Sequence, residues 1–546
     1  MFIKKSFSTK AKRKIPYYQI VQSYREDGKV KHRVLANLGA LSEVQIDGLI
    51  RSLNRLKESP YPLDSLKLEH ERQFRYGDCY LVSTLWHRLE IGQAIQRLVA
   101  NTKVGFDVAL CTQLMVLNRC VDPMSKLALT EWQKTVYFEA QNSFDYHQIL
   151  RTLDYLEKIR DELEGVLFHK QVDLFRQSVD LVFFDVTSTY FEGEGPGIAE
   201  RGHSQDGKPE NNQIILALAI TKGGLPIGHE IYEGSRKDSQ TVVDMLERLK
   251  GRFQIDQCIF IGDRGMVSPD NIAELERLNY EYIFALRKRH LRESAAVIEP
   301  DLNRYQELKV DAAGQEITKL KYLEVVKGDL RYLVCHNPKV AEEELARLES
   351  KLAEKEAAIQ KILQGRRPSD GMLKAIARIW NINRYFLYGL RDGKVWYQPH
   401  TKALEQERLV AGKFVLKSSN RSLSPVQIIE AYKNLSEIER AFRTIKSFVE
   451  IRPMYHRSES RVRGHVLVCV LAYYIQKVID QELKRASSPY SALKAIEKLG
   501  EIRLIENVLA GRRFYQSITL GPEHKKILKA LKIEPMPEAV FKEQIH

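Results

Sequence analysis

Two apolar runs that each end in an aspartate constrain the fold of this chain more than any other feature. The run LVFF at 181–184 precedes Asp185, and the run CIFIG at 258–262 precedes Asp263. Short apolar runs bounded by turn residues are typical of buried strands. A carboxylate at the end of a buried strand is costly unless it is paired or bound to a metal ion. The two runs therefore predict a sheet that carries two acids where its strands end.

The elements around these runs follow a defined order between residues 176 and 289. Helices are expected at 238–250 and from Ser268, a favourable N-cap that Pro269 follows at the first helical turn. Strands are expected at 181–187, 213–221, 225–234, 257–263 and 280–287. The order β-β-β-α-β-α-β is that of an α/β, ribonuclease-H-like fold, and only its final helix is missing.

The missing helix is expected far downstream. Ser424 and Gln427 form a capping box, with Pro425 at the first helical position. The helix is expected to run to about residue 449, because Pro453 blocks any extension.

Glu439 lies in this downstream helix, seven residues after Tyr432 and seven before Lys446. Seven residues at about 100° each return to nearly the same direction, so the three side chains are expected to share one face. Leu435 and Phe442 belong to that face too. An apolar stripe with one acid predicts a carboxylate held against the sheet.

Two other interpretations of this region stay open. Glu439 precedes Arg443 by four residues, so the two side chains can instead form a solvated ion pair. Glu437 is a competing acid, although it points about 160° away from Glu439 on the helix.

Asp185, Asp263 and Glu439 together form a set of carboxylates that can hold a pair of divalent metal ions. Two ions about 4 Å apart activate a water and stabilise the leaving oxygen in phosphodiester cleavage. An all-oxygen ligand set favours Mg²⁺, with Mn²⁺ as a substitute. Each aspartate also has a plainer interpretation: Asp185 as a cap of the following turn, and Asp263 as an ordinary aspartate before a glycine turn.

The charge of the chain indicates a polyanionic partner, DNA or RNA. The 546 residues include 85 Lys+Arg against 71 Asp+Glu, a formal net charge of +14. Neutralised phosphates release counterions and drive binding; a basic protein without such a partner remains the alternative. The six cysteines form no CxxC pair, which favours buried thiols over zinc ligands or disulfides. Residues 1–14 lack the apolar run of a secretory signal, and the apolar stretch 466–475 is too short to span a bilayer, so a cytoplasmic protein without a membrane partner is expected.

The remaining segments complete the expected domain organisation. The N-terminal segment contains a predicted hairpin of strands at 17–23 and 29–38 and a helix from Ser42, and is either a DNA-binding module or a structural arm. A charged helix at 341–363 has apolar residues at heptad spacing, and its short length favours a local helical hairpin over a dimerising coiled coil. The expected domains are a small basic β/α module at 1–60, a helical domain at 65–175, the first part of the ribonuclease-H-like core at 176–289, a β-rich insertion with one charged helix at 290–423, the final helices of the core at 424–485, and a C-terminal helical tail at 486–546.

The chain resembles a DDE transposase of a bacterial insertion sequence, from the superfamily with a tyrosine–arginine–glutamate–lysine signature. That signature is Tyr-x2-Arg-x3-Glu-x6-Lys, and the chain matches it at Tyr432, Glu439 and Lys446. It departs at Leu435, where the signature has the arginine. The segments DVTSTYFE and GDRGM around the two aspartates match as well, and so does the β-rich insertion. The resemblance covers about residues 175–480.

This resemblance implies a function and a site. It implies that Asp185, Asp263 and Glu439 form the catalytic triad, and that Tyr432 and Lys446 contact DNA near the cleaved phosphate. The activity would be metal-dependent strand cleavage and strand transfer at the ends of an insertion sequence. The partners would be double-stranded transposon ends and target DNA, bound by a homodimer at the bacterial nucleoid. Two rival functions remain: an endonuclease of the same fold that only hydrolyses, and a non-catalytic DNA-binding remnant.

Further polar segments are candidates for DNA binding. Arg443, one turn after Glu439, is our candidate for the charge that is missing at Leu435. The polar loop 201–208 is expected near the DNA. The basic run at 452–465 is equally well explained as a DNA contact and as a solvated face.

One tryptophan is a candidate for a more specific role. Related hairpin-forming transposases stack a tryptophan of the insertion on a flipped base beside the cut. Trp396 is our candidate, because it follows a turn in an expected hairpin; packing inside the insertion is the alternative. Trp380 is expected to be packed on the apolar side of a helical run, and Trp86 and Trp132 are expected in the core of the helical domain.

Overall fold

The computed structural model divides the chain into two compact units. The sheet unit comprises Met1–Phe74, Arg503–Thr519 and Pro537–His546, and the main unit comprises Arg75–Ile502 and Leu520–Met536. The structure describes residues 2–10, 13–26, 28–39, 46, 49–50, 68–138, 143–175, 181–202, 204–237, 240–255, 258–266, 268–286, 293, 296–308, 320–365, 368–509, 512–517, 519–536 and 539–541.

The first sheet of the sheet unit is antiparallel. Its middle strand β2 (Arg13–Glu26) pairs with β1 (Phe2–Lys10) and with β3 (Lys29–Gly39). β2 and β3 form the predicted hairpin, and Gly28 in its turn has φ +71°, a conformation that suits a residue without a Cβ. The helix predicted from Ser42 lies mostly outside the described residues.

The second sheet corrects the prediction of a helical tail at 486–546. Its strand order is β18-β17-β16-β4. The strands are β4 (Leu68–Arg75), β16 (Arg503–Leu509), β17 (Arg512–Ser517) and β18 (Ala539–Phe541). β16 pairs with a strand that lies far upstream in the chain, and such a long-range pairing is not visible in the local sequence.

Helices form the first part of the main unit, but the helical domain predicted from residue 65 was wrong at its start, because residues 68–75 form β4. They are α2 (Gly77–Arg88), α3 (Ile91–Val99), α4 (Val108–Val121), α5 (Leu129–Trp132) and α6 (Tyr146–Phe175). Trp86 and Trp132 are 2% and 4% exposed, so their predicted core positions are confirmed. The six cysteines are free and buried, which confirms the prediction of buried thiols.

The long helix α16 (Glu459–Arg485) packs against α4 and α6. By length and composition α16 is apolar enough to cross a membrane, but 89% of its most apolar window is buried inside the protein. A helix that is apolar on all sides and buried in this way is a core helix. Two shorter helices, α17 (Ala492–Leu499) and α18 (Pro522–Ala530), follow it.

A nine-stranded sheet has the order β10-β11-β12-β15-β9-β8-β5-β6-β7. β5 (Leu181–Tyr190), β6 (Gln213–Thr221) and β7 (Pro226–Glu233) are antiparallel neighbours, whereas β8 (Ile259–Gly262) and β9 (Glu281–Leu286) run parallel to β5. The helices α7 (Thr241–Gly251) and α8 (Pro269–Arg277) complete the predicted order β-β-β-α-β-α-β. The predicted N-cap is confirmed, because the Ser268 side chain accepts a hydrogen bond from the Asn271 backbone.

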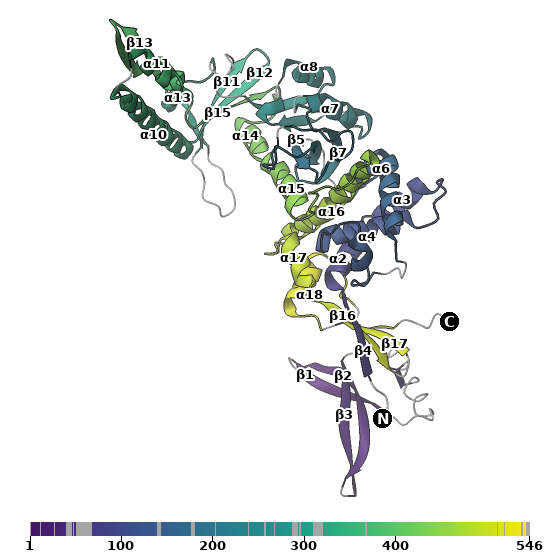
Figure 1. Cartoon of the computed structure of the whole chain (residues 1–546). Helices are drawn as coiled ribbons and strands as arrows, with labels where there is room; N and C mark the ends of the chain where they lie inside the picture. Colours follow the sequence, from purple (N-terminus) through teal and green to yellow (C-terminus); the bar gives the residue numbers. More distant parts are fainter. Residues whose placement is uncertain are drawn as a thin grey trace. The chain divides into compact units, whose positions relative to one another are not determined.

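The insertion continues this sheet beyond β9 (Figure 1). Its strands β10 (Gln306–Leu308), β11 (Leu320–Lys327), β12 (Leu330–His336) and β15 (Lys413–Ser418) are added antiparallel to one another, and β15 pairs with β9. The expected hairpins therefore belong in part to the nine-stranded sheet.

The rest of the insertion is a helical module with its own core. The described part contains four helices, so the prediction of one charged helix was wrong. They are α10 (Pro338–Leu363), α11 (Ser369–Ala377), α12 (Ile382–Tyr385) and α13 (Thr401–Val410), with the hairpin of β13 (Phe386–Arg391) and β14 (Lys394–Pro399). Leu348 and Ile359 of α10 pack in this core with Ile376 and Phe386. The heptad residues of α10 thus bury a local face, which short-range spacing could not distinguish from a dimer seam.

The final helix of the core is broken into two helices, so the prediction of one helix to residue 449 was wrong. α14 (Pro425–Lys433) begins with the predicted capping box of Ser424 and Gln427, and α15 (Ser436–Ser447) follows. Leu435 lies at the break and is only 8% exposed. Packing of an amphipathic face stabilises a helix more than one further turn of hydrogen bonds does. The position of a break is therefore set by tertiary packing, which helix periodicity in the sequence does not reveal.

Candidate active site

Asp185 lies on β5, and Asp263 directly follows β8, the parallel neighbour of β5. Asp185 lies two residues beyond Phe183, and Asp263 lies two residues beyond Ile261. The paired positions of β5 and β8 are Leu181↔Ile259, Val182↔Phe260 and Phe183↔Ile261. Neighbouring strands are about 4.8 Å apart, so this register brings the two acids side by side.

Asp185 points to the face of the sheet that α15 covers. Val182 and Phe184 of β5 pack on the opposite face, in a core with residues of α7 and α8. Side chains alternate along a strand, so Asp185 points away from that core. α15 contacts β5, and α14 contacts β8 and β9, but neither helix contributes to that core.

Tyr432 connects α14 to the second acid. Its hydroxyl donates a hydrogen bond of 3.4 Å to Oδ1 of Asp263, and its ring stacks on Phe414. The helix break means that Tyr432 is not on the same helix as Glu439 and Lys446. The predicted common face therefore holds for Glu439, Phe442 and Lys446, which all lie on α15.

The structure separates Glu439 from the competing acid Glu437. Glu437 accepts hydrogen bonds from Lys477 at 2.9 Å and from Arg440, which makes it a structural ion-pair residue. Glu439 is exposed and makes no hydrogen bond or ion pair with the side chains of the described residues. The alternative i,i+4 pair with Arg443 is likewise not formed among them.

Lys446 is engaged inside the protein. Its Nζ lies 2.7 Å from Oδ1 of Asp206, which also pairs with Arg452. Burial of Lys446 lowers the pKa of its ammonium group, and the Asp206 carboxylate opposes that shift. Asp206 was not singled out from the sequence, where only its polar loop indicated a function. Its partners lie more than two hundred residues away in the sequence, and Lys446 is 240 residues downstream, so no local signal identifies Asp206.

The position of the missing arginine is not open to DNA. Leu435, which replaces it, is buried at the junction of α14 and α15. Arg443 is exposed on α15 and makes no ion pair with the described residues. The structure thus leaves the Arg443 guanidinium available for a phosphate.

The basic run at 452–465 is not a uniformly charged surface. The rings of His456 and His465 lie 5.2 Å apart. Burial and the nearby Lys126 ammonium lower the pKa of His456 to about 3 and the pKa of His465 well below its usual value. Both imidazoles are therefore neutral and do not add to the positive charge of this segment.

Of the two tryptophans of the insertion, Trp380 differs from its predicted environment and Trp396 lies on a hairpin, as predicted. Trp380 is 79% exposed beyond the end of α11, so the prediction that it is packed was wrong. Trp380 follows Ala377, the last residue of α11, and is therefore not on the apolar side of that helix. Trp396 on β14 is 38% exposed and lies opposite Gly389 in the hairpin.

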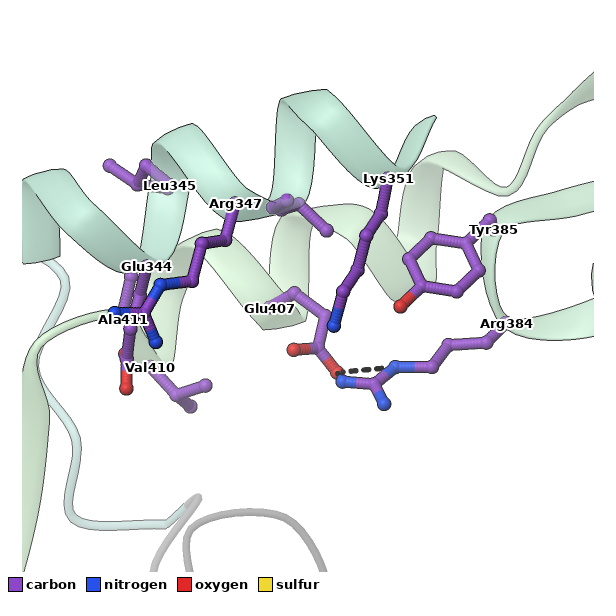
Figure 2. Close-up of a pocket in the computed structure, with 10 residues that line it drawn as sticks. Glu344, Leu345, Arg347, Lys351, Arg384, Tyr385, Glu407, Val410 and Ala411 are labelled. Carbon is purple, nitrogen blue, oxygen red and sulfur yellow. Dashed lines mark hydrogen bonds and ion pairs between the residues drawn. The ribbon is translucent and has the colours of Figure 1, made fainter. Parts of the chain in front are cut away.

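A pocket of about 210 Å³ lies in the helical module, between α10, α12 and α13. Figure 2 shows charged side chains of both signs around it, and Arg384 pairs with Glu407 at 2.6 Å across it. None of the predicted site residues lines this pocket. We therefore do not assign it to the chemistry of the acids.

The two aspartates fit a divalent cation by their donor chemistry. Carboxylate oxygens without sulfur or imidazole ligands suit Mg²⁺ or Mn²⁺. The described residues form no cluster of three or more His, Cys, Asp or Glu side chains that would enclose a metal ion. The structure thus brings Asp185 and Asp263 together and places Glu439 on a helix that contacts β5, but it does not gather the three acids into a closed ligand set.

Comparison with known proteins defines the class of this chain. The family described as transposase DDE domain matches residues 178–475, more than half of the 546 residues. The chain therefore belongs to the DDE transposases. Residues 3–64 match the N-terminal domain of IS1634 family transposases. The protein is a DDE transposase of an insertion sequence, an enzyme class whose general activity is DNA cleavage and strand transfer and which generally uses divalent metal ions.

Similarity to solved transposase structures is weaker. A piggyBac transposase synaptic complex with hairpin DNA has a TM-score of 0.39 and 9% identity, over 78% of this chain and 79% of that chain. A Mos1 transposase paired-end complex with the left transposon end has a TM-score of 0.14 and 16% identity, over 43% of this chain and 66% of that chain. Scores this low carry no argument about individual residues. No curated protein matches the chain.

Proposed function

We propose that this transposase has a ribonuclease-H-like catalytic core in which Asp185, Asp263 and Glu439 cut and join DNA at the ends of an insertion sequence. The strand order β7-β6-β5-β8-β9, with β8 and β9 parallel to β5, supports that fold. The observation that carries the site is the register of β5 and β8, which pairs Phe183 with Ile261, each two residues before an aspartate.

Two Mg²⁺ ions, with Mn²⁺ as a substitute, are the cofactor that suits this ligand set. Asp185 and Asp263 would hold the ions from the strands, and Glu439 would complete the ligands from α15. When bound, the ions activate water and stabilise the leaving oxygen. Tyr432 orients the Asp263 carboxylate through its hydroxyl. Because Glu439 is exposed and pairs with no side chain of the described residues, no ion pair has to break before it binds a cation.

Four residues are proposed as DNA contacts: Tyr432, Arg443, Lys446 and Trp396. Arg443 has the best support, because its guanidinium is exposed and unpaired among the described residues. The Lys446 ammonium group would attract the DNA phosphates electrostatically while it remains paired with Asp206. Trp396 is half exposed and sits on a hairpin that projects an aromatic ring beside Gly389.

The assembly is proposed on the same basis. A homodimer would pair two double-stranded transposon ends and bring them to target DNA, in the bacterial cytoplasm at the nucleoid. The expected division into domains at 1–60, 65–175, 176–289, 290–423, 424–485 and 486–546 is kept as a proposal, with the sheet extension and the strands of the C-terminal segment described above.

The test uses full-length protein, a DNA duplex carrying the element end, a supercoiled target plasmid and Mg²⁺. The inverted repeats that flank the gene supply the end sequence. We expect cleaved ends and joined products. Cleaved ends without joined products would favour the hydrolytic nuclease of the same fold. DNA binding without cleavage would favour the non-catalytic remnant.

A further inference from the structure

The loop after β5 carries a buried acid that the proposed chemistry does not use. The Asp206 side chain is 4% exposed, and its Oδ1 contacts both Lys446 and Arg452. Its Oδ2 is buried and has no hydrogen-bond partner among the described residues. Two cations approach a single buried carboxylate oxygen, so removing the Asp206 carboxylate would leave the largely buried Lys446 ammonium group without its partner.

The backbone of this loop is attached to β5 just beyond the first acid of the site. Thr187 donates to Oε1 of Gln205 at 2.8 Å, and the Gln205 backbone donates to Ser188 at 2.9 Å. Thr187 and Ser188 are two and three residues after Asp185. Asp206 is therefore fixed relative to the strand that carries Asp185.

The partners of Asp206 belong to the helix that carries the third acid and to the segment after it. Lys446 is seven residues after Glu439 on α15, so both residues lie on one face of that helix. The segment with Arg452 is bridged to β5 as well, since Met454 donates to Tyr190 at 3.2 Å and accepts from Glu192 at 2.9 Å. The Asp206 carboxylate thus ties the two acid-bearing elements, β5 and α15, to each other.

We propose that Asp206 is a positioning residue of the active site: through Lys446 it holds α15 against β5 and so sets the distance of Glu439 from Asp185. The inference rests on the proposed function, because it takes Glu439 and Asp185 as ligands of the same metal ions. Asp206 itself touches neither DNA nor metal in this role. Partners outside the ligand shell of a metal site typically change metal affinity by about 10- to 100-fold when they are replaced.

The experiment measures metal affinity as well as activity. Full-length protein bound to a duplex with the element end is titrated with Mn²⁺, and free Mn²⁺ is followed by electron paramagnetic resonance. Cleavage is measured in parallel over a range of Mg²⁺ concentrations. We expect Asp206→Asn to weaken Mn²⁺ binding and to raise the Mg²⁺ midpoint by about tenfold. Unchanged metal binding and an unchanged midpoint would overturn the proposal.

A double-mutant cycle tests whether Asp206 acts through Lys446. We expect Lys446→Met to shift the midpoint in the same direction as Asp206→Asn, and the double variant to be no worse than Asp206→Asn alone, because that change already removes the interaction between Asp206 and Lys446. Additive shifts would overturn the proposal. If Asp206→Asn does not fold, Asp206→Glu replaces it. That variant keeps the charge but lengthens the side chain, so the midpoint should still shift, and a wild-type midpoint would count against the role.

Two sets of controls separate the possible failures. Asp244 on α7 pairs with Arg236 at 2.6 Å, and α7 packs on the opposite face of the sheet, so Asp244→Asn should leave the metal midpoint unchanged. Asp185→Asn and Glu439→Gln should lose metal binding. If they retain it, the proposed function fails and the role of Asp206 fails with it. If they lose it while Asp206→Asn keeps it, only the positioning role is wrong.

Discussion

The hydroxyl of Tyr432 donates a hydrogen bond of 3.4 Å to Oδ1 of Asp263. The tyrosine ring is held in place by Phe414 of β15, with 6.2 Å between ring centroids. α14 therefore reaches the acid that follows β8, and β15, a strand that the insertion adds to the sheet, supports Tyr432. This links the insertion to the geometry of the acids without any direct contact between them.

Tyr432→Phe should slow cleavage by about fivefold. The change removes one long hydrogen bond, worth roughly 1 kcal/mol, and leaves the ring stacked on Phe414. The measurement is the rate of single-turnover cleavage at saturating Mg²⁺. Tyr322→Phe is the matched control, because it removes a hydroxyl that bonds Gln306 at 2.9 Å on β10 and β11. Equal rates for Tyr432→Phe and the wild type would show that Asp263 needs no orientation by Tyr432.

Neutral isosteres of the three acids should abolish cleavage. We expect Asp185→Asn, Asp263→Asn and Glu439→Gln each to lower the rate by about three orders of magnitude or more, because bound metal supplies several kcal/mol of transition-state stabilisation. Binding to an end duplex, measured by gel shift, should stay close to wild type. Chelation of divalent ions should reproduce the defect. An acid whose isostere still cleaves at the wild-type rate does not belong to the triad.

Glu437→Gln provides the contrast within the same helix. Glu437 pairs with Lys477 and Arg440, so its loss should lower the free energy of unfolding by no more than about 1 kcal/mol. Cleavage should remain near wild type. A cleavage defect as deep as that of Glu439→Gln would assign the third acid to Glu437 instead.

The two aspartates were predictable because the information is local, but β5 continues to Tyr190, so Asp185 lies within its strand and not at the predicted strand end. Asp185 and Asp263 each follow an apolar run, and the alternation of strands and helices around them indicates the sheet order. The break in the downstream helix was not predictable in this way. No glycine or proline lies between Tyr432 and Glu439, and the burial of Leu435 that accompanies the break depends on tertiary packing that the local sequence does not show.

Asp206 illustrates a second limit of local sequence signals. It lies in a polar loop, and an acid in such a loop is ordinarily exposed. Its burial becomes clear only when Lys446 and Arg452 are brought to it from far downstream. Trp380 shows the opposite error, because it was predicted to be packed and is exposed. The apolar spacing placed Trp380 on a helix that ends three residues earlier, at Ala377.

Arg443→Ala should weaken binding to element ends and lower the dependence of log affinity on log salt by about one unit. That is the expected loss for one phosphate contact. Arg440→Ala is the matched comparison on the same helix, because Arg440 is paired with Glu437 and should change the salt dependence less. If Arg443→Ala binds and cleaves DNA normally, Arg443 does not replace the signature arginine whose position Leu435 occupies.

Trp396→Ala should leave nicking intact and reduce the formation of hairpin ends. A ring stacked on one base contributes about 1–3 kcal/mol. The Trp396 ring packs against Gly389. A Cβ atom at position 389 would lie only 2.9 Å from Trp396 Nε1, so the glycine leaves the room that the ring needs. Melting temperature must first show that the variant is folded, because Trp396 is partly packed.

Trp380→Ala decides between the two exposed tryptophans of the insertion. Trp380 is 79% exposed, so its removal should cost little stability, and any defect in processing would report a contact with DNA. We expect Trp380→Ala to form hairpins normally while Trp396→Ala does not. The reverse result would move the stacking role to Trp380. Normal hairpins from both folded variants, or none from the wild type, would exclude base stacking by a tryptophan of this insertion, because no other tryptophan lies within it.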